Sequence, residues 1–292
     1  MSNIRTIKIS SLVILSFFVF ILRLSAQFSV ETTVGTDLAK IPAGAVPFKD
    51  YRGAIILDAI INDSISIKAH FDTGAWGIAV PEKYRTPNDT TDVKVGGWAN
   101  KLKASYLEES NTFLRWFGQD CILFGWDFFD NKILEVSYKD SYIKVLDPDE
   151  LNSLEGYSRV PFRNRGKRLI LTAEVQMQGK NISGDFWIDT GLNGLVFFTH
   201  NIPALYNLSF DETKAGRARN MYNNETRIDI LAADTVKIGD SFVTHRDTLF
   251  PQGEWFVFKP NDIYIGLLGN QFFHDFSVVF DFRKNYLYLK PF

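Results

Sequence analysis

Apolar residues in this chain recur with the short period of β-strands, and the recurrence comes twice. Ala54 to Ile61 is almost entirely apolar, Asn62-Asp63 supplies a turn, and apolar and polar residues alternate from Ser64 to Lys68. This order predicts a β-hairpin. Leu169 to Met177 and Ile182 to Ile188 repeat it around a second turn, which contains glycine. The two halves of the chain therefore start alike.

The rest of each half follows the same plan. Val93 to Gly97 matches Val236 to Asp240 as a strand that runs into a turn, and each half closes on a hairpin, at Ile133 to Leu146 and at Ser277 to Leu289. Only single helical turns are expected, at Phe128 to Asn131 and at Gln271 to Asp275. The pattern predicts an all-β protein with little helix.

A loop with an acidic residue follows the first hairpin of each half. The first loop reads Phe71-Asp72-Thr73-Gly74-Ala75, and the second reads Ile188-Asp189-Thr190-Gly191-Leu192. Strand-like segments flank both loops, so the glycine supplies a tight turn and the carboxylate is held at a loop tip. One such triplet carries little information, because it also occurs in ordinary turns. Two triplets in matching contexts indicate a shared site.

A second pair of segments supports the duplication. Ile122 to Phe129 lies downstream of the first triplet, and Ile265 to Phe273 lies downstream of the second. With Gly125 placed on Gly269, the following residues align without a gap: Phe128 with Phe272, Phe129 with Phe273, Val136 with Phe280, Tyr142 with Tyr286 and Ile143 with Leu287. The chain therefore contains the same unit twice, in the same order.

Two Asp-Thr-Gly triplets, each with its own apolar-apolar-Gly segment, resemble the aspartic peptidases, and specifically retropepsin-like units fused in tandem as in the pepsin-like enzymes. The resemblance covers residues 48–292. It implies a bilobal acid-protease fold, in which two related β-barrel-like lobes hold the active site between them. The expected division is a first lobe over residues 27–150, an interlobe connection over residues 151–165 and a second lobe over residues 166–292.

The resemblance also implies roles for single residues. Asp72 and Asp189 would be the catalytic pair of an aspartic endopeptidase. Their supporting residues would be Thr73, Gly74, Thr190, Gly191, Gly125 and Gly269. In the family the threonines bond to the opposite loop, the next glycines let main-chain N–H groups approach the carboxylates, and the later glycines pack beneath the loops. Two adjacent carboxyl groups share one proton, so one acts as base and the other as acid, and the sequence leaves open which is which.

Two departures from the pepsin-like pattern change the expectations. Pepsin-like enzymes place a hydroxyl residue directly after the triplet, where this chain has Ala75 and Leu192. Fewer hydrogen bonds to the ionised form raise the pKa values of the pair, so we expect a pH optimum less acid than that of a pepsin. Trp76 is bulkier than the family usually shows, and we expect it to pack under the loop rather than to narrow the cleft.

The two halves differ most between the triplet and the later glycine. In the first half 53 positions separate the aspartate from that glycine, against 80 in the second half. The extra residues include the polar stretch Arg217 to Arg227, with Asn223-Asn224 at a turn. This stretch resembles the flap hairpin that covers substrate in the family. We therefore expect one flap, on the second lobe, with Tyr222 as a candidate contact, because Pro81 to Asp92 is too short to form one in the first.

The cysteine and the histidines are interpreted as structural residues rather than as catalytic or metal-binding ones. Cys121 is the sole cysteine, so no intrachain disulfide forms, and its apolar surroundings indicate a buried side chain rather than a nucleophile. The four histidines show no metal-ligand spacing, and we expect neither metal nor cofactor. His70, two residues before the first aspartate, is interpreted as packing. With net charge −2 and no basic cluster, the expected partner is a peptide or protein substrate and not nucleic acid.

Residues 1–26 have the pattern of a signal peptide. Arg5 and Lys8 precede the apolar run Leu12 to Leu22, and Leu24-Ser25-Ala26 offers small residues for cleavage before Gln27. The run is about half as long as a membrane-spanning helix needs. We expect an exported monomer, periplasmic or secreted, without a stable membrane anchor.

Two alternatives remain open. The chain could be a catalytically silent peptide-binding module that keeps the fold and the cleft, and the missing first-lobe flap is the main point in its favour. Each lobe could instead pair with its own copy in a dimer, with separate Asp72–Asp72 and Asp189–Asp189 sites. A structural β-domain with accidental triplets would require the matched glycine segments to be a coincidence.

Overall fold

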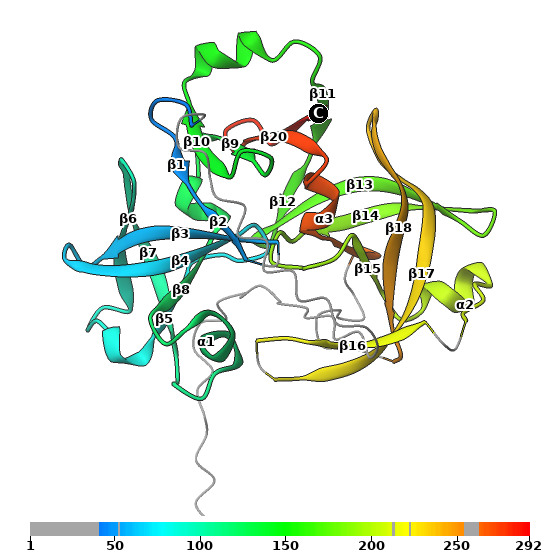
Figure 1. The fold of residues 1–292 in the computed structure, drawn as a ribbon, viewed down its shortest axis with the longest axis horizontal. Helices are drawn as coiled ribbons and strands as arrows, with labels where there is room; N and C mark the ends of the chain where they lie inside the picture. The colour runs from blue at the N-terminus through cyan, green and yellow to red at the C-terminus, as the bar shows by residue number, and fades with distance from the viewer. Residues whose placement is uncertain (1–40, 52, 212–213, 222, 254–262) are drawn as a thin grey trace, which may run out of the picture.

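Three β-sheets form most of the protein, one from each half of the chain and one from both (Figure 1). The computed structural model describes residues 41–51, 53–211, 214–221, 223–253 and 263–292, so the predicted signal peptide and Tyr222 lie outside the described residues. Strands outnumber the short helices throughout the described residues. The all-β, two-lobed fold predicted from the sequence is confirmed.

The sheet of the first lobe has seven strands and carries the first aspartate loop. In spatial order they are β2 (Lys49–Tyr51), β3 (Ala54–Ile61), β4 (Ile65–Asp72), β8 (Cys121–Gly125), β5 (Ile78–Pro81), β7 (Trp98–Leu107) and β6 (Thr90–Val95). The predicted hairpin is β3–β4. Strand β4 then runs parallel to β8, with Asp72 opposite Gly125 at their ends.

The sheet of the second lobe has eight strands and repeats this arrangement. Its order is β12 (Arg163–Arg165), β13 (Arg168–Met177), β14 (Lys180–Ile188), β19 (Gly266–Leu268), β15 (Val196–Phe198), β18 (Ser241–Pro251), β17 (Glu225–Ile238) and β16 (Ala215–Arg219). Strand β14 is parallel to β19, as β4 is to β8. The pairing of β13 with β17 likewise repeats that of β3 with β6. The added length of the second half forms β16 and the start of β17.

The third sheet joins the two halves. Its strands are β1 (Val46–Pro47), β10 (Tyr142–Leu146), β9 (Ile133–Ser137), β20 (Phe276–Asp281), β21 (Tyr286–Pro291) and β11 (Ser158–Pro161), and β9 pairs with β20 at its centre. Val136 faces Ile143 across one hairpin as Phe280 faces Leu287 across the other. The alignment made from the sequence therefore places equivalent residues at equivalent positions.

The stretch predicted as the interlobe connection is partly built into the sheets. The 3-10 helix η4 (Pro148–Ser153) leads into β11, which pairs with β21, and β12 then pairs with β13. The connection therefore adds an edge strand to the joining sheet and another to the sheet of the second lobe.

Short helices fill the ends of the sheets. The expected turns after the two glycines are η3 (Trp126–Phe129) and α3 (Asn270–Phe273). The sequence pattern did not predict η2 (Glu82–Tyr84), α1 (Thr112–Phe117) or α2 (Ile202–Tyr206). Asn111 begins α1, because its Oδ1 accepts the Phe113 N–H at 2.9 Å, and Gly118 ends it with a φ of 102°. No helix among the described residues is long and apolar enough to span a membrane.

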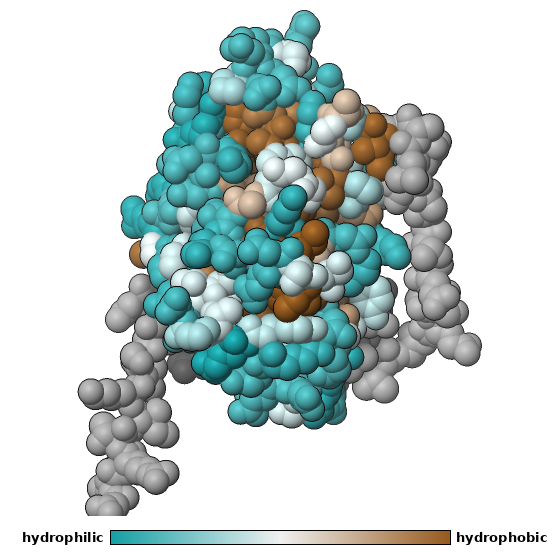
Figure 2. All heavy atoms as spheres, turned by 90° about the vertical axis from the view of Figure 1, so that its left-hand side faces the viewer, coloured by the Kyte–Doolittle hydropathy of each residue, from teal (hydrophilic) through white to brown (hydrophobic). Residues whose placement is uncertain are grey.

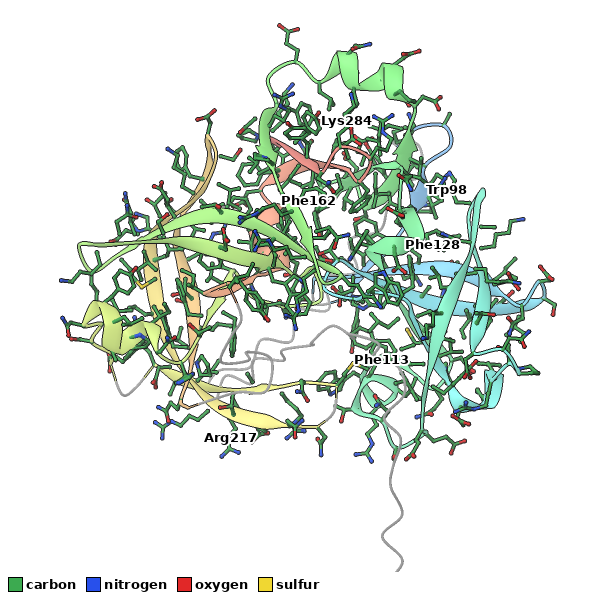
Figure 3. All side chains as sticks on the ribbon, turned by 180° about the vertical axis from the view of Figure 1, so that it is seen from behind. Trp98, Phe113, Phe128, Phe162, Arg217 and Lys284 are labelled. Atoms are coloured by element: carbon green, nitrogen blue, oxygen red, sulfur yellow. The ribbon has the colours of Figure 1, made fainter. Side chains whose placement is uncertain are left out.

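A continuous apolar core runs from one lobe through the joining sheet into the other, and aromatic rings fill much of it (Figure 3). Phe128, labelled there, packs edge-to-face on Phe124 and Phe129 with ring centroids 5.1 and 4.8 Å apart. Its counterpart Phe272 is buried in the same core. The aromatic residues of the sequence therefore serve mainly as core.

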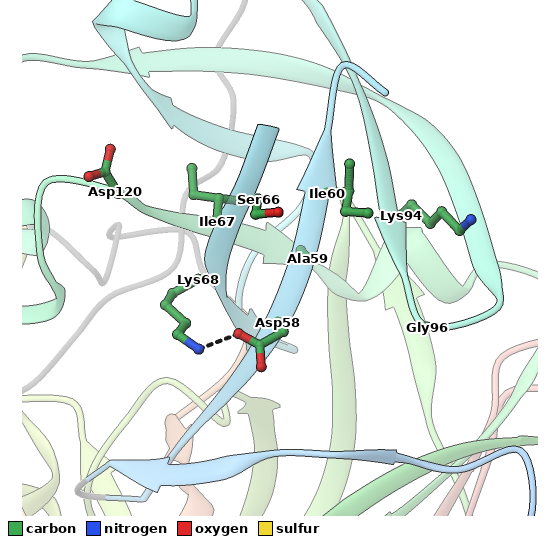
Figure 4. A pocket seen from close by; sticks show the side chains of 9 residues that line it. All are labelled: Asp58, Ala59, Ile60, Ser66, Ile67, Lys68, Lys94, Gly96 and Asp120. Atoms are coloured by element: carbon green, nitrogen blue, oxygen red, sulfur yellow. Dashed lines mark hydrogen bonds and ion pairs between the residues drawn. The ribbon is translucent and has the colours of Figure 1, made fainter. Parts of the chain in front are cut away.

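The outer side of the first lobe is mostly hydrophilic, with small apolar patches between charged side chains (Figure 2). A groove of about 720 Å³ lies on this lobe between β3, β4 and β6, and Lys68 pairs with Asp58 along it (Figure 4). No residue of either aspartate loop lines this groove. The chemistry expected from the sequence therefore lies elsewhere, between the lobes.

Candidate active site

The ends of equivalent strands place the two predicted aspartates. Asp72 is the last residue of β4, and Asp189 follows the last residue of β14. The main-chain N–H of Asp189 donates to the Leu268 carbonyl at 2.9 Å, which continues the pairing of β14 with β19. Both aspartates have no exposed surface. The parallel strand pairs thus deliver both carboxyl groups to the buried centre of the molecule.

The threonines of the triplets join the two loops. The N–H of Thr73 donates to Thr190 Oγ1 at 2.9 Å, and the N–H of Thr190 donates to Thr73 Oγ1 at 3.1 Å. Thr73 Oγ1 also donates to the carbonyl of Ile188 at 3.2 Å. These reciprocal bonds link the two loops of a single chain, so the triplets meet without a second copy.

The glycines of the triplets permit this close approach. A Cβ atom added to Gly74 would lie 2.5 Å from Cγ of Asp189, and one added to Gly191 would collide with the carboxyl group of Asp72. Each glycine therefore faces the carboxyl group of the opposite loop. Any side chain at either position would force the two loops apart.

The later glycines support the loops from below, as the resemblance implies. A Cβ atom on Gly125 would lie 2.7 Å from Cα of Trp76, and one on Gly269 would lie 2.8 Å from the carbonyl oxygen of Leu192. Both clashes involve main chain, which cannot rotate away. Only glycine fits beneath either loop.

Hydrogen bonding distinguishes the two carboxyl groups. Oδ1 of Asp72 accepts the N–H of Gly74 at 2.7 Å and the N–H of Gly191 at 2.9 Å. Oδ1 of Asp189 accepts the N–H of Leu192 at 3.1 Å. The two carboxyl groups also contact each other. Because N–H donors favour the charged form, Asp72 has the better environment for a negative charge.

The pKa values agree with that distinction. Burial raises the pKa of Asp72 to about 7, against the lowering effect of the Gly74 and Gly191 N–H groups. Burial, followed by the negative charge of Asp72, raises the pKa of Asp189 well above its usual range. The two raised pKa values mean that the pair holds one shared proton in the singly protonated state, and the Gly74 and Gly191 N–H groups favour a charge on Asp72.

Neighbouring reactive residues are packing residues. His70 is fully buried, its ring is stacked on Phe117 with centroids 5.4 Å apart, and burial lowers its pKa to about 3. Burial also raises the pKa of the Cys121 thiol to about 12, so the thiol stays protonated. Trp76 packs against the large core, with Nζ of Lys167 3.2 Å from its ring centroid.

The hairpin β16–β17 carries the predicted flap stretch. Within its turn the N–H of Asn224 donates to Oδ1 of Asn220 at 3.0 Å, and next to the turn Glu225 pairs with Arg217 and Arg219, both at 2.5 Å. The corresponding part of the first lobe has only η2 and the loop that leads to β6. The hairpin is on the second lobe, as expected, while Tyr222 itself lies outside the described residues.

The turn of this hairpin reaches the first lobe (Figures 1 and 3). Met221 has no exposed surface and belongs to an apolar cluster with Ala75, Phe113 and Leu114, which are all first-lobe residues. The hairpin therefore closes over the side of the first aspartate loop. Sequence reasoning did not assign Met221 or α1 to the site, although the Asn111 cap before an apolar run and the Gly118 after it were signals for a short helix.

Comparisons with known proteins give matches at the level of structure. No family model matches the chain, and a search of curated proteins finds no match. Among solved structures, the chain is similar to an aspartic proteinase from Irpex lacteus, with 8% identity and a TM-score of 0.49, over 85% of this chain and 97% of that one. It is similar to Basic 7S globulin from soybean, with 9% identity and a TM-score of 0.47, over 84% and 94%.

A retropepsin-like aspartic protease from Rickettsia conorii is similar with 22% identity and a TM-score of 0.32, over 46% of this chain and 93% of that one. The internal geometry of the chain carries the assignment of its fold. Two equivalent triplets meet, each rests on its own glycine, and one sheet joins the halves. The chain has the bilobal acid-protease fold, and its resemblance to the aspartic peptidases is confirmed.

Proposed function

We propose that the chain is an exported aspartic endopeptidase that hydrolyses peptide bonds with Asp72 and Asp189. The contact between two buried carboxyl groups in unequal environments carries this proposal, because it yields one ionised and one protonated group near neutral pH. Export rests on the signal-peptide pattern of residues 1–26.

We take Asp72 as the base and Asp189 as the acid, because the Gly74 and Gly191 N–H groups favour a charge on Asp72. Asp72, as carboxylate, takes a proton from a water molecule whose oxygen attacks the peptide carbonyl carbon, while Asp189 gives its proton to the carbonyl oxygen. The tetrahedral diol then loses its amine. Asp72 passes its proton to the leaving nitrogen, Asp189 recovers a proton from a hydroxyl of the diol, and the C–N bond breaks. The starting protonation states are restored.

The hairpin supplies a lid for this reaction. Met221 packs on the first lobe in one cluster with Ala75, and both carboxyl groups are fully buried, so lifting of the hairpin would open the first aspartate loop to a peptide. Closure over a bound peptide would then exclude water from the reacting bond.

The same burial favours a second function, a peptide-binding module without turnover. In that protein the hairpin would open to admit a peptide, and the carboxyl groups would serve only to hold the two loops together. The two functions differ in whether the proton shared by the two carboxyl groups is ever transferred to a bound peptide.

The test is cleavage of an unfolded protein by purified residues 27–292 between pH 3 and pH 8. Wild type is compared with Asp72→Asn and Asp189→Asn. Each substitution keeps the shape of the site and removes one titratable carboxyl group. The proposal expects each substitution to abolish cleavage. Half of the activity remaining in each variant would indicate two self-paired sites in a dimer. Binding of peptide without cleavage by wild type at any pH would establish the binding module instead.

A further inference from the structure

One residue of the second half touches the first aspartate loop from outside. Lys167 lies in the turn before β13 with a φ of 74°, and its Nζ lies 3.2 Å from the ring centroid of Trp76, two residues beyond Gly74. Its carbonyl oxygen accepts the indole N–H of Trp126 at 3.1 Å. Trp126 directly follows Gly125, the glycine beneath that loop. Lys167 therefore contacts both the loop and its support.

The loop is tied to this support by its main chain and by one carboxyl group. Gly125 N–H donates to the carbonyl of Gly77 at 2.9 Å, and Gly77 N–H donates to Oδ1 of Asp127 at 2.8 Å. The pKa of Asp127 is raised to about 6, mainly by burial and also by nearby Asp130, against the lowering effects of the Gly77 N–H and the charge of Lys167. Lys167 thus favours the ionised carboxylate, which is the stronger acceptor for Gly77.

The second half holds its loop without a charge. Gln271 occupies the position of Asp127, and its Nε2 lies 3.4 Å from Oδ1 of Asn193. Asn270 occupies the position of Trp126 and donates from Nδ2 to the carbonyl of Thr190 at 3.2 Å. Gly53, the counterpart of Lys167, has no side chain and packs against Asn270.

The lysine is therefore a feature of one half and not a requirement of the duplicated fold. The equivalent turn in the first half works with a glycine, and the equivalent support in the second half works with a neutral amide. A residue needed only for folding would be expected in both places. The charge of Lys167 and the charge of Asp127 occur together, and both groups contact the loop that carries Asp72.

We propose that Lys167 is a positioning residue: from the second lobe its ammonium group covers Trp76, and so fixes the first aspartate loop with Asp72 opposite Asp189. This proposal rests on the proposed peptidase function. The groups that act on Lys167 itself are Lys103, which disfavours its charge, and Asp127, which favours it. Because Asp127 titrates near pH 6, the support of the loop weakens as the pH falls below that value.

The test compares four single variants and one double variant with wild type. Lys167→Met keeps the apolar stem and removes the charge, Lys167→Arg keeps the charge, and Asp127→Asn removes its partner. Lys103→Met is the matched control, because it removes a neighbouring exposed charge that has no contact with Trp76 among the described residues. Each is measured for kcat and KM against pH and for hydrogen exchange of the Gly77 amide, and those that keep Asp127 are also measured for titration of its carboxyl by NMR.

The positioning role gives a specific pattern. Lys167→Met should lower kcat about tenfold with KM within about twofold of wild type, because a loop displaced by a fraction of an ångström loses alignment while the cleft stays intact. It should also raise the pKa of Asp127, move the acid limb of kcat to higher pH and speed Gly77 exchange. Lys167→Arg and Lys103→Met should behave as wild type. Lys167→Met added to Asp127→Asn should cause no further shift of the acid limb.

Three results would overturn the proposal. One is a Lys167→Met variant with unchanged Gly77 exchange and Asp127 titration. Another is an equal loss of kcat in the Lys103→Met control. The third is a loss in Lys167→Met matched by Lys167→Arg, which would indicate packing alone. Exchange and titration need no substrate, so they decide the positioning role even if wild type cleaves nothing, a result that would defeat the peptidase proposal alone.

Discussion

The loops around Asp72 and Asp189 have the same backbone and different surroundings. The glycines beneath them adopt φ and ψ of −88° and 177° at Gly125 and of −90° and 177° at Gly269. Above them, Asp72 accepts the Gly74 N–H and the Gly191 N–H of the opposite loop, whereas Asp189 accepts the Leu192 N–H of its own loop. A two-fold arrangement of main chain therefore holds two carboxyl groups that are not equivalent.

Side chains next to the loops differ even more between the lobes. Two residues before each aspartate stand His70 and Trp187, both fully buried. The first lobe has only η2 and a loop where the second lobe has the hairpin β16–β17, whose turn packs on the first lobe. The duplication has kept the residues that close backbone contact requires, and it has diverged wherever a side chain only has to fill space or provide charge. Substitutions should distinguish the residues that close backbone contact requires from those that only fill space or provide charge.

The largest effects are expected at the glycines beneath the loops. Gly125→Ala and Gly269→Ala should each cost about 3 kcal/mol or more of the free energy of unfolding, or prevent folding, because the added Cβ meets main chain. Gly97→Ala is the control, since a Cβ there meets nothing within 4 Å. Urea unfolding measures all three. A mild effect at one glycine and a severe one at the other would show that the two supports are not equivalent.

His70 and Trp187 should differ in their response to acid. Because burial lowers the pKa of His70 to about 3, the unfolded chain binds more protons than the folded one between that value and the usual pKa of histidine, and His70 lowers stability as the pH falls through this window. His70→Phe should therefore gain about 2 kcal/mol relative to wild type at pH 4.5. Trp187→Phe should shift stability equally at all pH values.

Urea unfolding at several pH values gives the difference curves for the two variants. The dyad has the opposite sign, because its raised pKa values cost stability as the pH rises, but it is common to all three proteins and cancels in the differences. Parallel curves for His70→Phe and Trp187→Phe would contradict the assignment of a buried neutral imidazole.

The comparison of the lobes also explains what the sequence could predict. Strands, triplets and supporting glycines could be predicted because period-two alternation and backbone crowding act within a few residues. The second-lobe hairpin could be predicted from the added length. In contrast, α1 has only six residues, too few for a helical period, although Asn111 caps it. Contacts such as Met221 on Leu114 and Lys167 on Trp76 join distant segments, and no local pattern encodes them.

A smaller effect is expected where the hairpin meets the first lobe. Met221→Ala removes a buried apolar contact between lobes and should lower the free energy of opening the hairpin by about 1–2 kcal/mol. Exchange of the Asn224 amide, which is bonded within the turn, should speed up accordingly. The amide of Val236, at the far end of β17, should be unaffected. Phe242→Ala, at a side chain that is 58% exposed, is the control.

If Asn224 exchange stays at the wild-type rate in Met221→Ala, the contact with the first lobe does not hold the hairpin closed. The ion pairs of Glu225 with Arg217 and Arg219 would then hold the hairpin β16–β17 in place. These pairs lie within the second lobe. Raising the salt concentration would weaken them, because Glu225 and both arginines are partly exposed.

The smallest effect is expected from restoring a hydroxyl beside Asp72. Ala75→Ser adds the hydrogen-bond donor that pepsin-like enzymes place after the triplet, and a donor to the ionised form lowers the pKa of the pair. The acid limb of kcat/KM should therefore move about half a pH unit to lower pH. Because Asp72 now titrates near 7 through burial, the wild-type limb should lie far above pH 3. A wild-type limb at or below pH 3 would show that the dyad is hydrated in solution and that burial does not set its protonation.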